Sequence, residues 1–147
     1  MTFGKLIEEL SARLGVEIED AGGAFALEID GQTVVLQLAG GRDGDILLTR
    51  ADLGDIPPDR RGALAAAALE ANFLYQGTGG ATLAVNPGDG HLHLHRYDWL
   101  DRMDAERALS VLSRFTETVA AWSRIVAESP SAAAEAPPPR EAGFMPV

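Results

Sequence analysis

Three histidines alternate along one short segment, at His91, His93 and His95. Residues two apart lie on the same face of a β-strand, so the imidazoles share one face and Leu92 and Leu94 occupy the other. Imidazoles at this spacing can bind one metal ion, or change charge near neutral pH and make partner binding pH-sensitive. No acidic pattern that would support a metal is evident beside them. We therefore interpret them as the solvent side of an amphipathic strand and assign no metal ligand; metal binding and pH sensing stay open.

Other residues that could carry catalysis do not combine into a site. The glycine-rich segment Gly77 to Gly80 follows a predicted helix and precedes a predicted strand, which is the reverse of a phosphate-binding loop, and Lys5 is the only lysine. The chain has no cysteine, and the serines of the predicted helices have no histidine nearby in sequence. The sequence therefore predicts a binding protein rather than an enzyme, with no catalytic residue and no cofactor.

The charge balance is strongly acidic. Twenty-two acidic residues oppose 12 basic ones in a chain of 147, for a formal net charge of −10. Such a surface repels phosphate backbones and anionic lipids, so neither nucleic acid nor a membrane surface is an expected partner. A basic or extended polypeptide suits it better, although negative charge can also serve solubility alone.

The N-terminal residues, Met1 to Leu10, carry charges and lack the apolar core of a signal peptide. The longest wholly apolar run, Ala63 to Leu69, is too short to cross a bilayer. We therefore expect a cytoplasmic protein without membrane insertion, and the absence of cysteine suits that compartment.

The first half of the chain predicts one helix and three strands. A helix with apolar residues at helical spacing runs from Phe3 to Leu14, with Thr2 as its cap. Three short runs, at 25–29, 33–38 and 45–50, alternate or are rich in β-branched residues and are separated by glycine turns. They predict a three-stranded antiparallel meander.

The second half predicts a helix, two strands and a final helix. An alanine-rich helix spans about 59–75, strands follow at 81–85 and 91–97, and the last helix opens at Asp101 or Asp104. The Ala/Pro-rich residues 129–147 predict a disordered tail. The expected fold is α+β: one domain over 1–128, in the order α-β-β-β-α-β-β-α, with an antiparallel twisted sheet flanked by helices.

The alanine-rich helix is apolar nearly all round. Six alanines lie between Ala63 and Ala71, together with Leu64 and Leu69. A helix of this kind must be covered on more than one side. In a domain this small, a second subunit is a good candidate for the extra cover.

Several local patterns together resemble the class I type III secretion chaperones of the Tir-chaperone (CesT-like) family. The second helix closes on Leu69-Glu70-Ala71-Asn72-Phe73, and a glycine-rich break and a strand Ala81-Thr82-Leu83-Ala84-Val85 follow. The alternating His91-Leu92-His93-Leu94 strand and a last helix with Phe115 and Trp122 complete the match. The resemblance covers residues 1 to about 128, and the tail lies outside it.

The resemblance implies a small acidic homodimer that binds the N-terminal chaperone-binding segment of a secreted effector in extended form. It also implies contact with the secretion export apparatus, and no ATP hydrolysis by the chaperone itself. The effector-binding positions that it implies are Phe3, Leu6, Ile7, Leu10, Leu14, Phe25, Leu27, Val35 and Leu47. The implied dimer positions are Leu64, Ala67, Ala68, Ala71, Asn72 and Leu83.

Each of these assignments has an alternative. The apolar stripe of the first helix and the residues of the first sheet can equally be core. A regulator or adaptor on the same chaperone-like fold, or a metal-dependent enzyme that uses the histidine strand, are competing interpretations of the function. The sequence identifies neither the effectors, nor their number, nor a role for the tail.

Overall fold

The computed structural model describes residues 1–20 and 22–128. Its elements are α1 (Phe3–Leu14), β1 (Glu19–Asp20), β2 (Ala24–Ile29), β3 (Gln32–Gly41), β4 (Gly44–Asp55), η1 (Pro58–Arg60), α2 (Arg61–Asn72), η2 (Phe73–Tyr75), β5 (Thr82–Val85), β6 (His91–Trp99), η3 (Leu100–Arg102) and α3 (Ala105–Ala127). The predicted α+β order is confirmed, with the two-residue strand β1 as an addition. The domain limits stay a prediction, and the tail lies outside the described residues.

Local signals set the ends of α1. The Thr2 hydroxyl oxygen accepts the Lys5 backbone N–H at 3.2 Å and caps the N-terminus. Gly15 adopts the left-handed conformation at φ 63° and donates its N–H to the Ser11 carbonyl at 3.0 Å. The helix between these caps buries Leu6, Ile7 and Leu10 against the rest of the domain.

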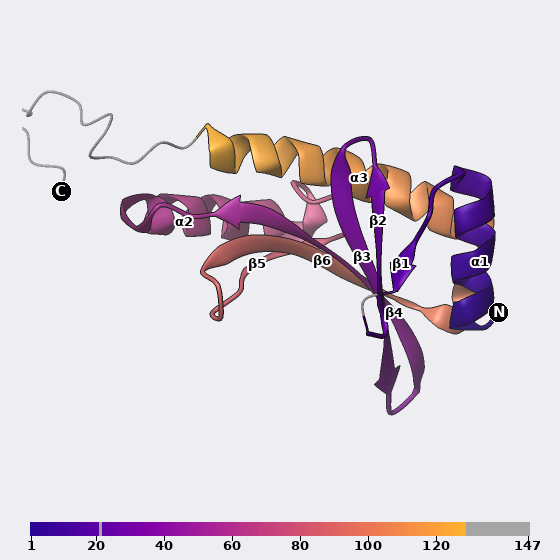
Figure 1. Cartoon of the computed structure of the whole chain (residues 1–147). Coiled ribbons are helices and arrows are strands. Elements are labelled where there is room, and N and C mark those ends of the chain that lie inside the picture. Colours follow the sequence, from indigo (N-terminus) through magenta and orange to yellow (C-terminus); the bar gives the residue numbers. More distant parts are fainter. Residues whose placement is uncertain (21, 129–147) are drawn as a thin grey trace, which may run out of the picture.

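The long helix α3 covers one face of the sheet. Asp104, rather than Asp101, is its cap, and its carboxylate accepts the Arg107 N–H at 2.7 Å. Residues at helical spacing along α3 are buried, among them Leu112, Phe115 and Val119. Figure 1 shows α2 and α3 along the same side of β5 and β6.

The six strands form one antiparallel sheet in the order β1-β2-β3-β4-β6-β5. Alternate residues of the inner strands are buried, and the core centres on the leucines that lie on this face. The opposite face carries Val35, Arg50 and His93, which are half-buried. The sheet therefore has one face in the core, one face open to solvent, and two edges, β1 and β5.

No helix within the described residues is long and apolar enough to span a membrane.

Candidate functional site

An aromatic pair joins α1 to the sheet. The rings of Phe3 and Phe25 meet edge to face, with centroids 5.4 Å apart and planes at 69°. Both side chains are only partly buried, and Leu14 at the other end of α1 is partly buried as well. The helix and strand β2 thus present accessible apolar surface beside the β1 edge of the sheet.

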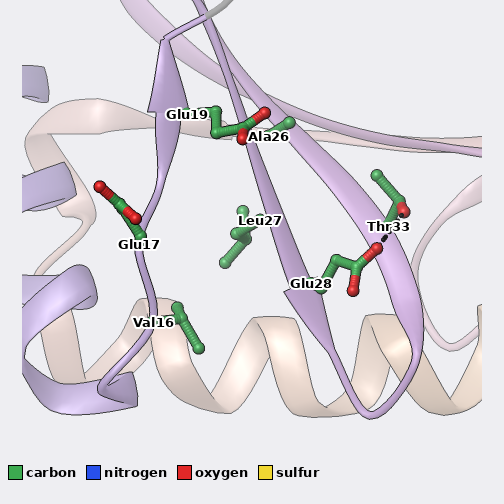
Figure 2. A pocket seen from close by; sticks show the side chains of 7 residues that line it. All are labelled: Val16, Glu17, Glu19, Ala26, Leu27, Glu28 and Thr33. Carbon is green, nitrogen blue, oxygen red and sulfur yellow. Dashed lines mark hydrogen bonds between the residues drawn. The ribbon is translucent and has the colours of Figure 1, made fainter.

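A pocket of about 310 Å³ opens at the β1 edge. Figure 2 shows its lining, which consists of Val16, Glu17, Glu19, Ala26, Leu27, Glu28 and Thr33. Val16 and Ala26 supply apolar surface, and the carboxylates of Glu17, Glu19 and Glu28 surround it. The Thr33 hydroxyl donates to the Glu28 carboxylate at 3.4 Å. The pocket therefore combines an apolar wall with a negative rim.

The outer side of β1 has no strand beside it among the described residues. This strand pairs only with β2, through Glu19 opposite Ala26 and Asp20 opposite Phe25. Unpaired backbone groups at a sheet edge can accept a further strand, and short length and negative charge are common protections against unwanted pairing. An extended segment with positive charge is attracted by Glu19 and Asp20 rather than repelled, so the negative charge of β1 does not prevent it from pairing there.

The residues implied as effector-binding fall into two groups. Leu6 and Leu10 are 0% exposed, and Ile7, Leu27 and Leu47 are also buried. These five side chains occupy the core, as the alternative interpretation expected. The side chains with accessible surface are those of Phe3, Leu14, Phe25 and Val35.

The β5 edge is closed from within the same chain. The Asn72 side chain, at the end of α2, donates to the Leu83 carbonyl at 3.0 Å and accepts the Leu83 N–H at 2.8 Å. One amide side chain thus pairs both outward backbone groups of Leu83 as a neighbouring strand would. The resemblance implied Asn72 and Leu83 as dimer positions, and the structure shows that the two residues contact each other within the same chain.

Helix α2 has a buried side and an exposed side, and its alanine-rich composition did not show which residues lie on each. Among the implied dimer residues, Leu64, Ala68 and Leu83 are buried, and Ala67, Ala71 and Asn72 are half-buried. The large apolar side chains that stay exposed around the end of this helix are Leu69, Phe73, Leu74 and Tyr75, with exposures of 57% to 71%. Sequence reasoning missed these four as candidate interface residues, although Leu69 and Phe73 belong to the pattern that it singled out.

The backbone at this end of α2 is strained. Leu74 and Tyr75 have φ angles of 52° and 57°, in the left-handed region that residues other than glycine rarely adopt. Such strain persists where surrounding contacts hold it and is frequent at binding surfaces. Both side chains are largely exposed.

The histidine strand has acidic partners, which corrects the expectation that none is present. Nδ1 of His91 lies 2.8 Å from Oδ2 of Asp52, and Nε2 of His93 lies 3.2 Å from Oδ2 of Asp89. His95 lies on the same face but outside this group. Asp89, two residues before His91, was readable from the sequence; Asp52 depends on the pairing of β4 with β6.

The charges in this group stabilise one another. The hydrogen bond to Asp52 raises the pKa of His91. The His91 backbone N–H is the main cause that lowers the pKa of Asp89. Partial burial acts to raise the pKa of Asp52, but hydrogen bonds from His91 and the Gly54 N–H outweigh it and the pKa falls below its usual value. Both carboxylates are therefore held in the ionised form.

A comparison with family models identifies the family of this chain. The family model of the Tir chaperone protein (CesT) family matches residues 5–123, which is well over half of the chain. The chain belongs to the Tir chaperone (CesT) family. It is accordingly a chaperone-family protein and not an enzyme, and the matched range includes α2 with Asn72, β5 and the histidine strand.

Solved structures share the fold of this CesT-family chain at low sequence identity. A chain of the ExsC–ExsE complex matches with a TM-score of 0.65 and 20% identity, over 83% of this chain and 91% of that one. A chain of the HopA1–SchA chaperone–effector complex matches at 0.61 and 18%, over 86% and 94%. A chain of the heterodimeric ExoU–SpcU complex from the type III secretion system of Pseudomonas aeruginosa matches at 0.62 and 17%, over 82% and 97%. Among curated proteins, none matches in sequence.

Proposed function

We propose that this chain is a cytoplasmic type III secretion chaperone that binds the N-terminal chaperone-binding segment of a secreted effector and keeps it soluble and export-competent. The observation that carries the proposal is the open β1 edge, with an acidic pocket and the Phe3–Phe25 pair beside it, in a CesT-family chain. Chains of similar fold occur in a chaperone–effector complex and in a complex of the type III secretion system.

The β1 edge supports an extended mode of binding. An extended peptide can add backbone hydrogen bonds at a sheet edge and place alternate side chains in pockets. Apolar side chains of the segment would cover Phe3 and Phe25, and a lysine or arginine would enter the pocket between Glu17, Glu19 and Glu28. The long stem of a basic side chain suits an apolar wall with a charged rim. A segment held in this way stays unfolded and ready for threading.

A homodimer is the second part of the proposal, and α2 is the surface that supports it. One side of α2 packs on β5, and the other leaves Leu69 and Phe73 more than 60% exposed. A stable interface removes about 800 Å² from each partner and centres on apolar and aromatic side chains. A second copy that covers this surface would also hold Leu74 and Tyr75 in their strained conformation.

The effector test is co-expression of the untagged chain with the N-terminal segment of a secreted protein encoded beside it. We expect a soluble complex of two chaperone chains and one effector segment, with the mass measured by light scattering. A segment that stays insoluble with every such neighbour, or a complex that forms equally well with the folded C-terminal part, would contradict an extended-segment chaperone.

The dimer test uses the chain alone. Sedimentation should give twice the protomer mass of 15.5 kDa. Phe73→Glu should shift the mass to the monomer because it places a charge in the apolar surface, whereas Tyr97→Glu, at a similarly exposed tyrosine on β6, should leave the dimer intact. A wild-type monomer, or a dimer that survives Phe73→Glu and Leu69→Glu together, would exclude α2 as the interface.

A further inference from the structure

Four side chains on the open face of the sheet converge at the end of β4 and the start of β6. They are Asp52, Asp89, His91 and His93, and one potential ligand atom from each lies within 4.8 Å of the others. Asp52 comes from β4, directly opposite His93 of β6, and Asp89 comes from the turn between β5 and β6. The proposed chaperone function does not use this group.

The spacing of the ligand atoms suits a tetrahedral ion. Zinc binds imidazole nitrogen and carboxylate oxygen at about 2.0 Å, which separates neighbouring ligand atoms by about 3.3 Å. Nδ1 of His91 lies 2.8 Å from Oδ2 of Asp52 and 3.9 Å from Oδ2 of Asp89, and Nε2 of His93 lies 3.2 Å from the same Asp89 oxygen. All four ligand atoms lie within 4.8 Å of one another, so side-chain adjustments of about 1 Å would bring them to zinc-binding distances.

Both carboxylates also accept a backbone N–H through Oδ1. Oδ1 of Asp89 accepts the His91 backbone N–H at 2.8 Å, which leaves Oδ2 facing the two imidazoles. Oδ1 of Asp52 accepts the Gly54 N–H at 2.9 Å. Hydrogen bonds of this kind orient metal ligands and strengthen binding. The ligands are therefore positioned by the backbone before any ion arrives.

A β-bulge fixes the position of Asp52. The β4–β6 register shifts between Asp52 and Gly54, and Gly54 adopts φ 113°, a conformation open mainly to glycine. Bulges often occur where a side chain must be re-aimed beside a functional site. Here the bulge lets Oδ1 of Asp52 accept the Gly54 N–H while Oδ1 and Oδ2 lie 3.0 Å and 2.8 Å from Nδ1 of His91.

We propose that Asp52, Asp89, His91 and His93 form a zinc site that links the β5–β6 turn to strand β4. Two ionised aspartates and two neutral histidines balance the charge of one divalent ion, and the mixed nitrogen and oxygen set suits zinc. This site is separate from the β1 edge, because β2 and β3 lie between β1 and β4 in the sheet.

Titration of the full, untagged chain with Zn²⁺ in a calorimeter tests the proposal. We expect one Zn²⁺ per chain and a thermal midpoint that rises with Zn²⁺ concentration, because the ion binds the folded form. Co²⁺ should give the intense visible absorption of a tetrahedral site. Both His93→Gln and Asp89→Asn should weaken Zn²⁺ binding by at least about tenfold, since even outer-shell changes cost that much.

His95→Gln is the matched control, because His95 lies next along the same strand face but outside the four-residue group. It should retain the affinity and the cobalt spectrum of the unsubstituted chain. Circular dichroism verifies that each variant is folded, and Asp52→Asn replaces any variant that is not. Absence of saturable Zn²⁺ binding overturns the proposal, and so does equal weakening by His95→Gln. Neither result bears on effector binding, which is measured without metal.

Discussion

The two edge strands of the sheet, β5 and β1, differ in how their outward backbone groups are protected from pairing with another chain. At β5, the Asn72 side chain pairs both free backbone groups of Leu83, and α2 packs alongside. At β1, two acidic residues pair only with β2 and the outer side has no such partner within the described chain. An edge that is satisfied internally contributes to folding, whereas an edge protected only by charge stays available to a partner of opposite charge.

This difference separates residues for stability from residues for binding. Changes around β5 should lower the free energy of unfolding of the protomer. Changes around β1 should leave that free energy nearly constant and act on the affinity for an extended segment. A β5 variant that changes only affinity, or a β1 variant that lowers the free energy of unfolding, would contradict this division.

The largest effect is expected from Asn72→Ala. This substitution removes two hydrogen bonds and leaves both Leu83 backbone groups without a protein partner. At about 1 kcal/mol for each bond, the free energy of unfolding should fall by about 2 kcal/mol. Urea denaturation followed by circular dichroism measures the loss.

Asn86→Ala is the control for this loss. Asn86 makes one side-chain hydrogen bond, to the Gly88 N–H in an exposed turn. Its removal should cost less than about 1 kcal/mol. Equal losses in the two variants would mean that Asn72 is an ordinary surface amide and that the β5 edge is not closed by it.

A similar, somewhat smaller effect is expected from Gly77→Ala, in the connection between η2 and β5. A Cβ atom at this position would lie 2.7 Å from the Ala71 Cβ and 2.9 Å from its Cα, so the backbone must move. The Gly77 carbonyl also accepts the Trp122 indole N–H at 3.0 Å, which ties this connection to α3. Overpacking should lower the free energy of unfolding by about 1 to 2 kcal/mol, again in urea.

Gly62→Ala is the control, because a Cβ at Gly62 on α2 meets no atom within 4 Å. It should be neutral or stabilising, since alanine favours helix. If Gly77→Ala leaves the free energy of unfolding unchanged, the connection to β5 is loosely packed. This result would contradict the contribution to stability that we assign to the β5 edge.

The parts of the fold that depend on neighbours in sequence were predictable. Thr2 and Gly15 limit α1 through contacts within four residues, and the glycine turn at Gly31 separates β2 from β3. Strand β1 was not predictable, because Glu19 and Asp20 have no strand pattern and become a strand only by pairing with β2.

The site was less predictable than the fold because it depends on burial and register. An alanine-rich helix does not show in its sequence which side is covered, so the exposed Leu69 and Phe73 could not be told from the buried Leu64. Asp52 is 39 residues from His91, and only the β4–β6 register brings them together. The pocket at β1 likewise needs three separate segments.

At the β1 edge, the double variant Glu17→Lys/Glu19→Lys should change binding rather than stability. It reverses two of the three carboxylates of the pocket. Affinity for a basic effector segment should fall about tenfold at low salt, and the loss should shrink as salt rises. The free energy of unfolding should stay within about 0.5 kcal/mol of the unsubstituted value. Calorimetry at two salt concentrations measures the affinity.

The same change of charge in Asp43→Lys/Asp45→Lys provides the control. These aspartates are exposed around the β3–β4 turn and do not line the pocket. This variant should keep most of the affinity. If both variants lose affinity equally, net charge rather than the pocket attracts the effector, and the β1 edge is not the specific site.

The smallest effect is expected from Asp20→Ala. The Asp20 carboxylate accepts the Gly23 N–H at 3.0 Å in an exposed position beside β1. Its loss should cost no more than about 0.5 kcal/mol, because water replaces an exposed acceptor. The Gly23 amide should exchange its hydrogen faster, while the Leu83 amide at the other edge should keep its protection, both followed by NMR. A loss above about 1 kcal/mol would make β1 an integral part of the protomer, and both edges would then serve stability.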